Sequence, residues 1–411
     1  MTSYNSNPKA YINGVEVTNS TLENATATLG RNEIFNQPRP SYGIIQLVTY
    51  NGAAPTIELT DKIEVKLPLA NNTYLTIFTG WVTDIVTAIE AYGSVGNTVI
   101  STITASGGSH KAARALAGTT GYAQEYDGTR IENILYDALT YTWQDYLPNT
   151  AWNVQDPTLT WATIDPYVGT IDQPGNYELA AYSSGTTNAL SLAQQAASSG
   201  LGFLHDRGDG RIYYNDSDSR INYVGEFGFL QLPKNIILAS NLQATESIND
   251  IINQVSLTYA SGTETAQDND SIIDYGIAAA SISTQLFQQA QAAAQAASYL
   301  ALQKLPYKNV TSVAIELSNS AMTDSLRNSL IGVYPSLPVR IEDLPVAISA
   351  TDFDGFVEGY TWRLTRTQAR LDLIVSNLRY STESQQWEDV YVGDLWNTID
   401  ATITWQEAWV V

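Results

Sequence analysis

Short runs of Val, Ile, Thr and Tyr, separated by Gly, Pro and Asn, fill both ends of this 411-residue chain. Such runs predict β-strands joined by tight turns. Asn13-Gly14 lies between two of them and predicts a hairpin, and residues 63–67 alternate as a half-buried strand does. Further strands are expected over 74–90, with a bulge or bend at Gly80, and over 99–105. The first hundred residues therefore predict a β domain.

The pattern turns helical after Gly107-Gly108. A helix is expected over 109–116, and a second over 129–143, with Thr129 as its N-cap and one apolar face. The other elements expected here are a strand over 159–164, a helix over 187–198 that ends before Gly200, and strands over 202–205 and 211–214. Together these elements indicate an α/β module between two β-rich regions.

The β character returns from residue 236. A strand is expected over 251–259 and an acidic, polar loop over 261–270. The Ala- and Gln-rich stretch 283–304, which ends before Pro306, predicts a long helix. Later strands are expected over 310–317, 339–341, 356–364 and 370–375. Residues 381–411 contain four Trp, which suggests a segment docked onto another surface.

Charge and composition exclude several classes of protein. The chain has 20 Lys and Arg against 42 Asp and Glu, a net charge of −22, and no basic cluster, which argues against specific nucleic-acid binding. It has no Cys, and therefore no disulfide or thiolate metal site. No apolar stretch is long enough to span a membrane, and the first residues lack the apolar core of a signal peptide. Few charges and 25 Tyr favour a surface that packs against other subunits.

Catalytic and cofactor motifs are missing. The two histidines, His110 and His205, have no metal-ligand spacing, and we interpret both as structural or solvated. No nucleophile elbow, P-loop or dinucleotide fingerprint is present; Gly200-Leu201-Gly202 follows a helix and lacks a third glycine. Arg207-Gly208-Asp209 resembles an adhesion tripeptide but is explained by its place in a turn. We expect no cofactor, no metal and no catalytic residue.

Three acidic groups are candidate sites. Residues 215–219 and 268–270 resemble fragments of calcium loops, but both lack the central Gly and the distal Glu, so solvated turns are the favoured interpretation. Asp352, Asp354 and Glu358 form the best acid–base set, because a glycosidase needs two carboxylates across a cleft. Asp352 and Asp354 precede Gly355, so a turn accounts for them better than catalysis does.

Several segments, in order, resemble one family: the tail hub, baseplate hub or minor tail proteins of bacteriophages. They are 22–38, 63–67, 75–82 with Asp84, 112–116, 190–214, 250–259, 270–276, the helix before Pro306, and 355–362 with the strand after it. "N-x-V-x-L-x-Y", "S-I-x-x-Y-G" and "F-V-E-G-x-x-W" are the most telling of these motifs. They extend over most of the chain.

The resemblance implies a mainly β fold with α/β elements, in which two tail-tube-like β-barrel domains flank an inserted α/β module. The expected boundaries are 1–107 for the first domain, completed by part of 208–235, then 108–207 for the module, 236–380 for the second domain, and 381–411 for the docking tail. It also implies a structural virion protein with no enzyme in the hub: a homotrimer that joins the sixfold tail tube to the threefold tip and takes part in genome ejection.

The expected partners are the tail tube or distal tail protein, other tip or fibre proteins and the tape-measure protein. DNA would pass through the ring without specific binding, and an acidic channel wall would suit that passage; the alternative is that the acidity only keeps an outer surface soluble. Arg363, Arg366, Arg370 and Arg379 on the wall would contradict the acidic channel. Two other functions stay open: a cell-wall glycan hydrolase of the tail tip, and a glycan- or receptor-binding module with exposed aromatic platforms.

Overall fold

The computed structural model describes residues 4–50, 54–93, 96–139, 153–154, 170–349 and 352–380. The fold is mainly β with α/β elements, as the sequence predicts. The expected strand over 159–164 and the Trp-rich tail 381–411 lie outside the described residues. No helix within the described part of the chain is long and apolar enough to cross a bilayer.

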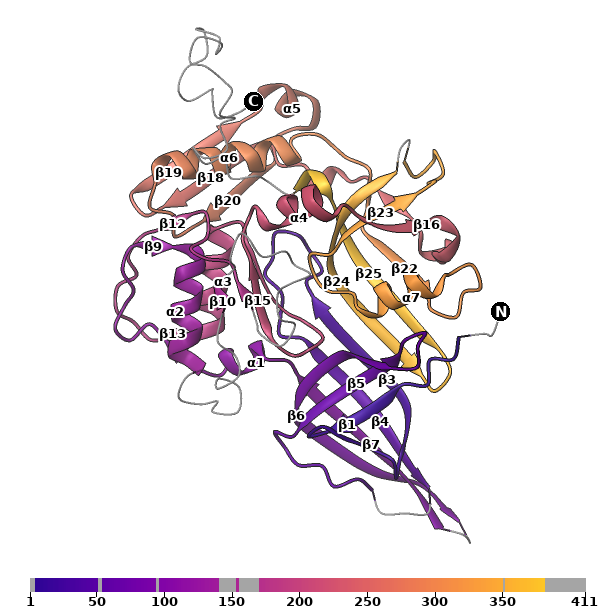
Figure 1. Cartoon of the computed structure of the whole chain (residues 1–411). Helices are drawn as coiled ribbons and strands as arrows, with labels where there is room; N and C mark the ends of the chain where they lie inside the picture. Colours follow the sequence, from indigo (N-terminus) through magenta and orange to yellow (C-terminus); the bar gives the residue numbers. More distant parts are fainter. Residues whose placement is uncertain are drawn as a thin grey trace.

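One large sheet of twelve strands joins the two ends of the chain (Figure 1). Its main path runs β16-β23-β24-β3-β4-β7-β6-β5-β1-β2, and β25 pairs with both β24 and β22. The strands are β1 (Lys9–Ile12), β2 (Val15–Glu16), β3 (Thr21–Gly30), β4 (Tyr42–Tyr50), β5 (Lys62–Pro68), β6 (Tyr74–Gly93), β7 (Gly96–Ser106), β16 (Leu230–Pro233), β22 (Ser312–Glu316), β23 (Pro338–Glu342), β24 (Phe353–Thr365) and β25 (Ala369–Asn377).

The antiparallel pairing of β3 with β24 unites the two β regions, with Gly30 opposite Gly359 and Asn24 opposite Thr365. A single hydrophobic core runs across this junction and contains, among others, Leu29, Phe78 and Trp362. Among the described strands the main path does not close, because β2 and β16 stand at its ends. The described strands therefore form one continuous sheet, whereas the family resemblance implies two β-barrel domains. The β3–β24 ladder links residues more than 300 apart, and no local sequence pattern indicates it.

The strands expected in the first β region are present, and β3 and β4 lie between them in the sequence without having been predicted. The β1–β2 hairpin turns at Asn13 and Gly14, both with positive φ, which suits a two-residue loop. Gly80 is an exception, since it pairs regularly with Ile63 and is not a bulge. A Cβ at Gly80 would lie 2.8 Å from the Phe78 ring, so close packing explains this glycine. The irregular pairing of β6 lies elsewhere, between Val82 and Asp84 for example.

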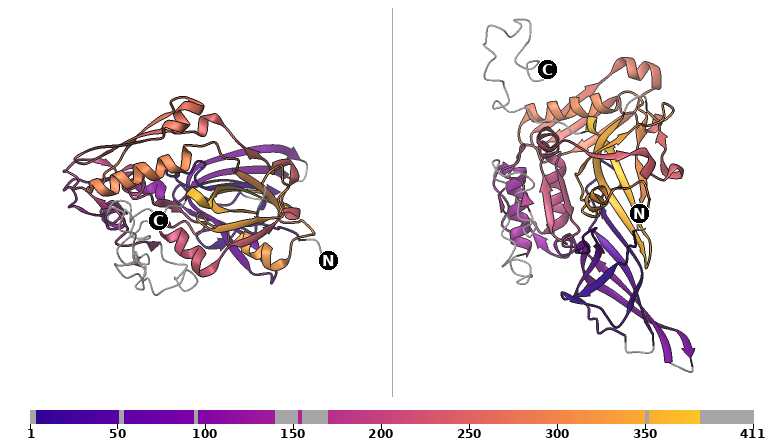
Figure 2. Two further views of the ribbon diagram at one scale, coloured as in Figure 1. Left: turned by 90° about the horizontal axis from the view of Figure 1, so that it is seen from above. Right: turned by 45° about the vertical axis from the view of Figure 1, so that its right-hand side comes forward.

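The α/β module lies beside the sheet and has its own core (Figure 2). Its elements are α1 (Ser109–Ala112), β8 (Leu116–Ala117), β9 (Glu125–Tyr126), α2 (Asp127–Leu139), β10 (Asn153–Val154), β11 (Thr170–Ile171), β12 (Glu178–Leu179), β13 (Thr187–Asn188), α3 (Ala189–Ser199), β14 (Phe203–Asp206) and β15 (Ile212–Asn215). At its end α4 (Ser219–Phe227) leads back to the sheet and contacts β23. The apolar face predicted for the second helix is buried in α2.

Two helix boundaries in the module differ from the prediction. The first helix ends at Ala112, because Leu116 pairs with Asn188 in a short antiparallel ladder. The second begins at Asp127 and not after Thr129, whose N–H binds the carbonyl of Pro174. In both cases a contact distant in sequence decides the boundary.

The remaining elements form a lobe above the module and short connections to the sheet (Figure 1). They are η1 (Lys234–Ile236), η2 (Ala239–Asn241), β17 (Ala244–Thr245), η3 (Ile248–Asp250), β18 (Gln254–Tyr259), β19 (Gly262–Gln267), α5 (Asn269–Tyr275), β20 (Ala279–Ser283), α6 (Gln289–Gln303), β21 (Asn309–Val310), α7 (Asp324–Ile331) and η4 (Leu378–Tyr380). Leu257, Leu286 and Ala296 of this lobe are buried in the core of the module.

Two predictions fail in this lobe. The polar stretch 261–270 is not a loop, since β19 pairs with β18 in antiparallel register. The long helix begins at Gln289 and not at Ser283, because Ser283 still pairs with Thr258 at the end of β20. The connecting residues stay extended: the N–H of Phe287 binds the carbonyl of Glu178 in the module at 2.9 Å. The expected domain boundaries stay a prediction.

Candidate functional site

The three candidate carboxylates do not form one acid–base set. Asp352 and Asp354 are near the surface beside Arg340, which holds Asp354 through two bonds of 2.6 and 2.7 Å. Asp352 accepts the backbone N–H of Asp343 at 3.0 Å. Glu358 is 1% exposed and binds a different set of partners.

A β-bulge in β24 places Glu358 inside the protein. The register with β25 shifts between Val357 and Gly359, so Glu358 is the extra residue in its strand. Its backbone carbonyl accepts the N–H of Arg31, the residue directly after β3. Gly30, with φ of +83°, makes this approach possible, because a Cβ there would lie 2.3 Å from the carbonyl oxygen of Glu358.

Two arginines neutralise the Glu358 carboxylate. Arg31 Nε donates to Oε2 at 2.7 Å, while Arg220 of α4 donates to Oε1 at 2.7 Å and to Oε2 at 3.1 Å. Ser376 Oγ of β25 also donates to Oε1. Arg220 Nε reaches Ser336 Oγ at 3.3 Å. This ionic junction therefore joins the two halves of the sheet to the end of the module.

The junction keeps Glu358 ionised. Burial alone would raise the pKa of Glu358, but the charges of Arg220 and Arg31 and the donated hydrogen bonds lower its pKa to about 2. Burial also lowers the pKa of Arg31 from its usual value, against the attraction of Glu358. A general acid needs a raised pKa, so Glu358 is unsuited to donate a proton near neutral pH.

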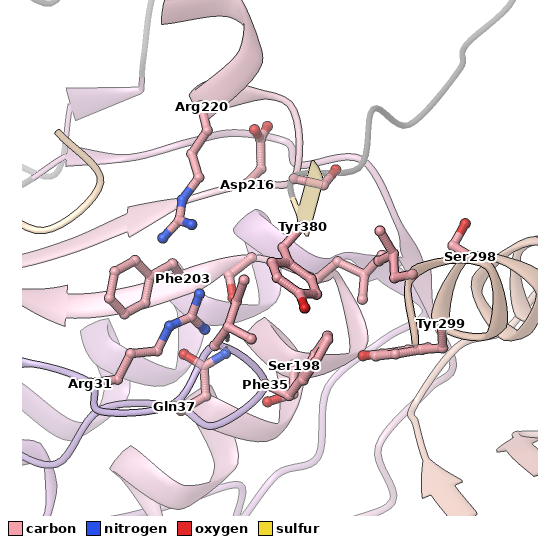
Figure 3. Close-up of a pocket in the computed structure, with 15 residues that line it drawn as sticks. Arg31, Phe35, Gln37, Ser198, Phe203, Asp216, Arg220, Ser298, Tyr299 and Tyr380 are labelled. Carbon is pink, nitrogen blue, oxygen red and sulfur yellow. Dashed lines mark hydrogen bonds between the residues drawn. The ribbon is translucent and has the colours of Figure 1, made fainter. Parts of the chain in front are cut away.

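A pocket lies next to this junction, between the sheet, the module and α6 (Figure 3). The Phe203 ring faces both guanidinium groups, with Arg31 Cζ at 4.2 Å and Arg220 Cζ at 5.0 Å from its centroid. On the other side Phe35 packs against Tyr299, at 5.4 Å, and against Tyr380, at 6.0 Å. The pocket is thus an aromatic recess whose arginines are already paired.

A second buried carboxylate ties the module to the sheet. Asp206, at the end of β14, accepts the N–H and hydroxyl of Ser41 and the N–H and hydroxyl of Ser109, at 2.7 to 3.0 Å. A Cβ on Gly107 would lie 2.0 Å from Ser41 Oγ, so only glycine fits here. Burial raises the pKa of Asp206, and the four donors oppose that rise.

Three more aspartates are buried inside the module. Asp127 accepts the N–H of Tyr177 at 3.0 Å and the hydroxyl of Tyr214, and burial raises its pKa to about 7. Asp172 and Asp216 both accept the hydroxyl of Ser219; burial raises the pKa of each, and their mutual repulsion adds to the rise for Asp172.

Each calcium-like fragment lies at the start of a helix. Asp268 is the N-cap of α5, whereas the N-cap of α4 is Asp218, whose side chain makes no cap bond. Asp216 accepts the N–H of Ser219 at 2.9 Å, at the start of α4. Asp268 accepts the N–H of Ser271 at 2.9 Å, at the start of α5, and binds Lys304. Within the described ranges, no three His, Cys, Asp or Glu side chains gather as metal ligands.

The two histidines and the Arg207-Gly208-Asp209 turn are packed against neighbouring residues of the fold. His205 is buried between the Phe203 and Tyr213 rings, and burial lowers its pKa far below the usual value. His110 is half-buried in α1, and burial lowers its pKa as well. The turn that contains Arg207-Gly208-Asp209 packs on β6, since a Cβ on Gly208 would lie 2.7 Å from the carbonyl of Ile77.

Sequence reasoning missed Arg31, Arg220 and Asp206, the residues that build both junctions. Arg31 is 327 residues from Glu358, and Asp206 is 165 residues from Ser41, so no local spacing connects them. The only local signal is glycine: Gly30 and Gly107 stand where backbone and side chains meet most closely.

No protein-family model matches the chain, and no curated protein matches its sequence. Among solved structures, the chain is similar to a tail protein from Neisseria meningitidis MC58, with a TM-score of 0.58, 13% identity, and coverage of 90% of this chain and 97% of that one. It is also similar to the 43 kDa tail protein of prophage MuSo2 from Shewanella oneidensis, with a TM-score of 0.54, 10% identity, and coverage of 90% and 96%. The chain thus has the fold of these two tail proteins, as the resemblance of its motifs implies.

Proposed function

We propose that this chain is a structural protein of a phage tail tip: a homotrimeric hub that joins the sixfold tail tube to a threefold tip. The observation that carries the proposal is the similarity of fold to two tail proteins over 90% of the chain. Because that similarity covers nearly the whole of both relatives, the assembly role rests on the entire fold and not on one shared domain.

The β6–β7 hairpin supports an assembly role. Together with β4, which pairs with β7 as far as Thr98, it extends away from the rest of the molecule (Figure 1). β5 pairs with β6 only as far as Trp81, and among the described strands none pairs with the outer edge of β6 beyond Val82. Val86 and Ile89 on this arm are 55% and 49% exposed. A long strand edge with exposed apolar side chains would pair with another chain, and a ring of subunits covers such edges.

The charge of the sheet supports an acidic passage for DNA. Strands β3, β4, β6 and β7 contain no Lys or Arg and three acids, Glu23, Asp84 and Glu90. Arg363 and Arg370 of the other half are each bound to Asp372, at 2.8 and 2.7 Å. In the proposed ring, these four strands form the tube-like wall, which repels phosphates and lets DNA pass unbound. The lysines of the neighbouring strands β1 and β5, Lys9, Lys62 and Lys66, are paired with Glu16 and Glu64.

The proposed partners follow from that position. The tail tube or distal tail protein would bind one side of the ring, and tip, fibre and tape-measure proteins the other. We propose no enzymatic role, since Glu358 is held ionised between two arginines and Asp354 is bound to Arg340. A hydrolase would need one of these carboxyl groups free to accept or donate a proton.

The test is an electron microscopy map of the virion tip with this chain located in it. We expect three copies, with more acidic than basic side chains along the channel. Fourfold or fivefold symmetry, or a channel lined by Arg363, Arg366 and Arg370, would overturn the proposal.

A pair of variants distinguishes a role of the arm, the β6–β7 hairpin beyond Val82, from a general loss of stability. Val86→Lys with Ile89→Lys should block incorporation into virions, because charges on the arm oppose strand pairing between subunits. Leu59→Lys, at a site 60% exposed and outside the arm, is the control and should assemble normally. Normal assembly of the double variant would contradict the role of the arm.

In a gel-shift assay at low salt the purified chain should not retard DNA.

A further inference from the structure

Exposed apolar side chains and three cations lie together where α6 ends. Leu305 and Tyr307, which follow α6, are 53% and 41% exposed. Arg379 Cζ lies 4.5 Å from the centroid of the Tyr307 ring, and Arg379 Nη2 donates to the carbonyl of Leu302 at 2.5 Å. We call residues 302–308 and 377–380 the α6 corner. It is continuous with the pocket, because Leu302 and Tyr380 line both.

The α6 corner has a net positive charge. Lys304, Lys308 and Arg379 contribute three cations. Two acids offset two of these charges. Asp268 binds Lys304 at 3.0 Å, and Asp250 lies close enough to Tyr380 for its charge to add to the rise that burial causes in the pKa of that tyrosine. The chain as a whole has the opposite character, with a net charge of −22. A positive, apolar corner on so acidic a protein suits an acidic, aromatic ligand.

Residues 381–411 have that composition. They include six Asp or Glu, no Lys or Arg, and four Trp, at 387, 396, 405 and 409. The first three Trp recur every nine residues, in W-E-D-V-Y-V-G-D-L-W and W-N-T-I-D-A-T-I-T-W. The segment continues directly from Tyr380, which is already part of the α6 corner.

We propose that residues 381–411 bind the α6 corner and the adjoining pocket of their own chain, with Trp side chains on Phe35, Leu305 and Tyr307. Fully extended, the segment reaches about 100 Å, so distance sets no limit. A short tether also gives the segment an effective concentration on the order of millimolar at this surface, which favours its own chain over a second copy. The inference goes beyond the proposed assembly role and does not depend on it.

Photo-crosslinking tests the proposal, because the chain contains no Cys and a single introduced thiol can be labelled with benzophenone maleimide. The probe variant is Leu305→Cys, and Leu59→Cys, at a site of similar exposure outside the α6 corner, is the matched control. Trypsin cuts after Arg379 and nowhere beyond it, so residues 380–411 leave as one peptide. We expect the labelled Leu305→Cys variant to crosslink to residues 387–411 of this peptide, located by fragmentation mass spectrometry, within monomeric chains and with a yield that tenfold dilution leaves unchanged. A crosslink to Tyr380 alone counts as none, because Tyr380 already belongs to the α6 corner. The labelled Leu59→Cys variant should give no such crosslink.

Three results would overturn the proposal: no crosslink from the Leu305→Cys variant to residues 387–411, an equal yield from the Leu59→Cys variant, or crosslinks on dimers that decrease on dilution. The last of these would assign the α6 corner to a second copy. Adding Lys304→Glu and Lys308→Glu to the Leu305→Cys variant should lower the yield several-fold, because both charges then repel the acidic segment. An unchanged yield in this triple variant would refute the claim that the lysines attract the acidic segment.

Discussion

Replacement of Glu358 by Gln is the most direct test of the ionic junction. The change keeps the shape of the side chain and leaves Arg31 and Arg220 buried without their counter-charge. Breaking a buried pair from one side destabilises a protein by about 3–5 kcal/mol. The lowered pKa of Glu358 gives a similar magnitude, because a change from 4.5 to about 2 corresponds to about 3 kcal/mol at neutral pH.

The pH dependence follows from the same pKa. Because folding lowers the pKa of Glu358, its ionised form stabilises the protein above pH 4.5, and this contribution is lost as the pH falls towards 2. Urea unfolding followed by circular dichroism should therefore show Glu358→Gln less stable by about 3 kcal/mol at pH 7. The difference from the wild type should shrink below pH 4.5, because the unfolded wild-type chain then binds a proton that the folded protein takes up only near pH 2.

Asp354→Asn is the matched control, the same kind of chemical change on the same strand. Its pair with Arg340 is about one-third exposed on each side, so we expect a loss of less than about 1 kcal/mol. Equal losses for the two variants, or a loss for Glu358→Gln that does not change between about pH 7 and pH 3, would refute the reasoning.

Three further predictions concern the other junctions. Asp206→Ala should destabilise the contact between module and sheet by about 1–3 kcal/mol, because two N–H groups and two hydroxyls lose their acceptor. We expect faster proteolysis around residues 107–109 in this variant, and an unchanged rate would contradict the prediction. Folding raises the pKa of Asp127 to about 7, so its ionisation opposes folding as the pH rises. The module should lose about 2–3 kcal/mol between about pH 5 and pH 8, and Asp127→Asn should flatten that dependence in urea unfolding; an equal slope in both proteins would count against it. Gly30→Ala should cost about 3 kcal/mol or more, because φ is +83° and its Cβ would overlap the carbonyl of Glu358. Gly228→Ala, with φ of +68°, ψ of −151° and open space around it, should cost less, about 1–2 kcal/mol. The melting temperatures of the two variants measure this order, and an equal loss for both would contradict it.

Local sequence patterns were sufficient to predict those elements whose backbone hydrogen bonds and buried face depend on residues close together in the chain. The hairpin at Asn13-Gly14, the alternation of 63–67 and the buried face of α2 are all present as predicted. Turn chemistry and hydrophobic period act within a few residues, so they can be interpreted without knowledge of the fold. The ordered motifs of a tail protein likewise agree with the fold that the structure shows.

How those pieces join depends on contacts that are distant in the chain. The β3–β24 ladder makes one sheet of two distant regions, and the α6 boundary depends on β20 pairing with β18. Glu358 lies in an acidic motif of the sequence, yet a β-bulge and two arginines far away in the chain make it a structural anion. Burial and ion pairing are set by residues hundreds of positions apart, and for that reason the charges that matter most here leave no local signal.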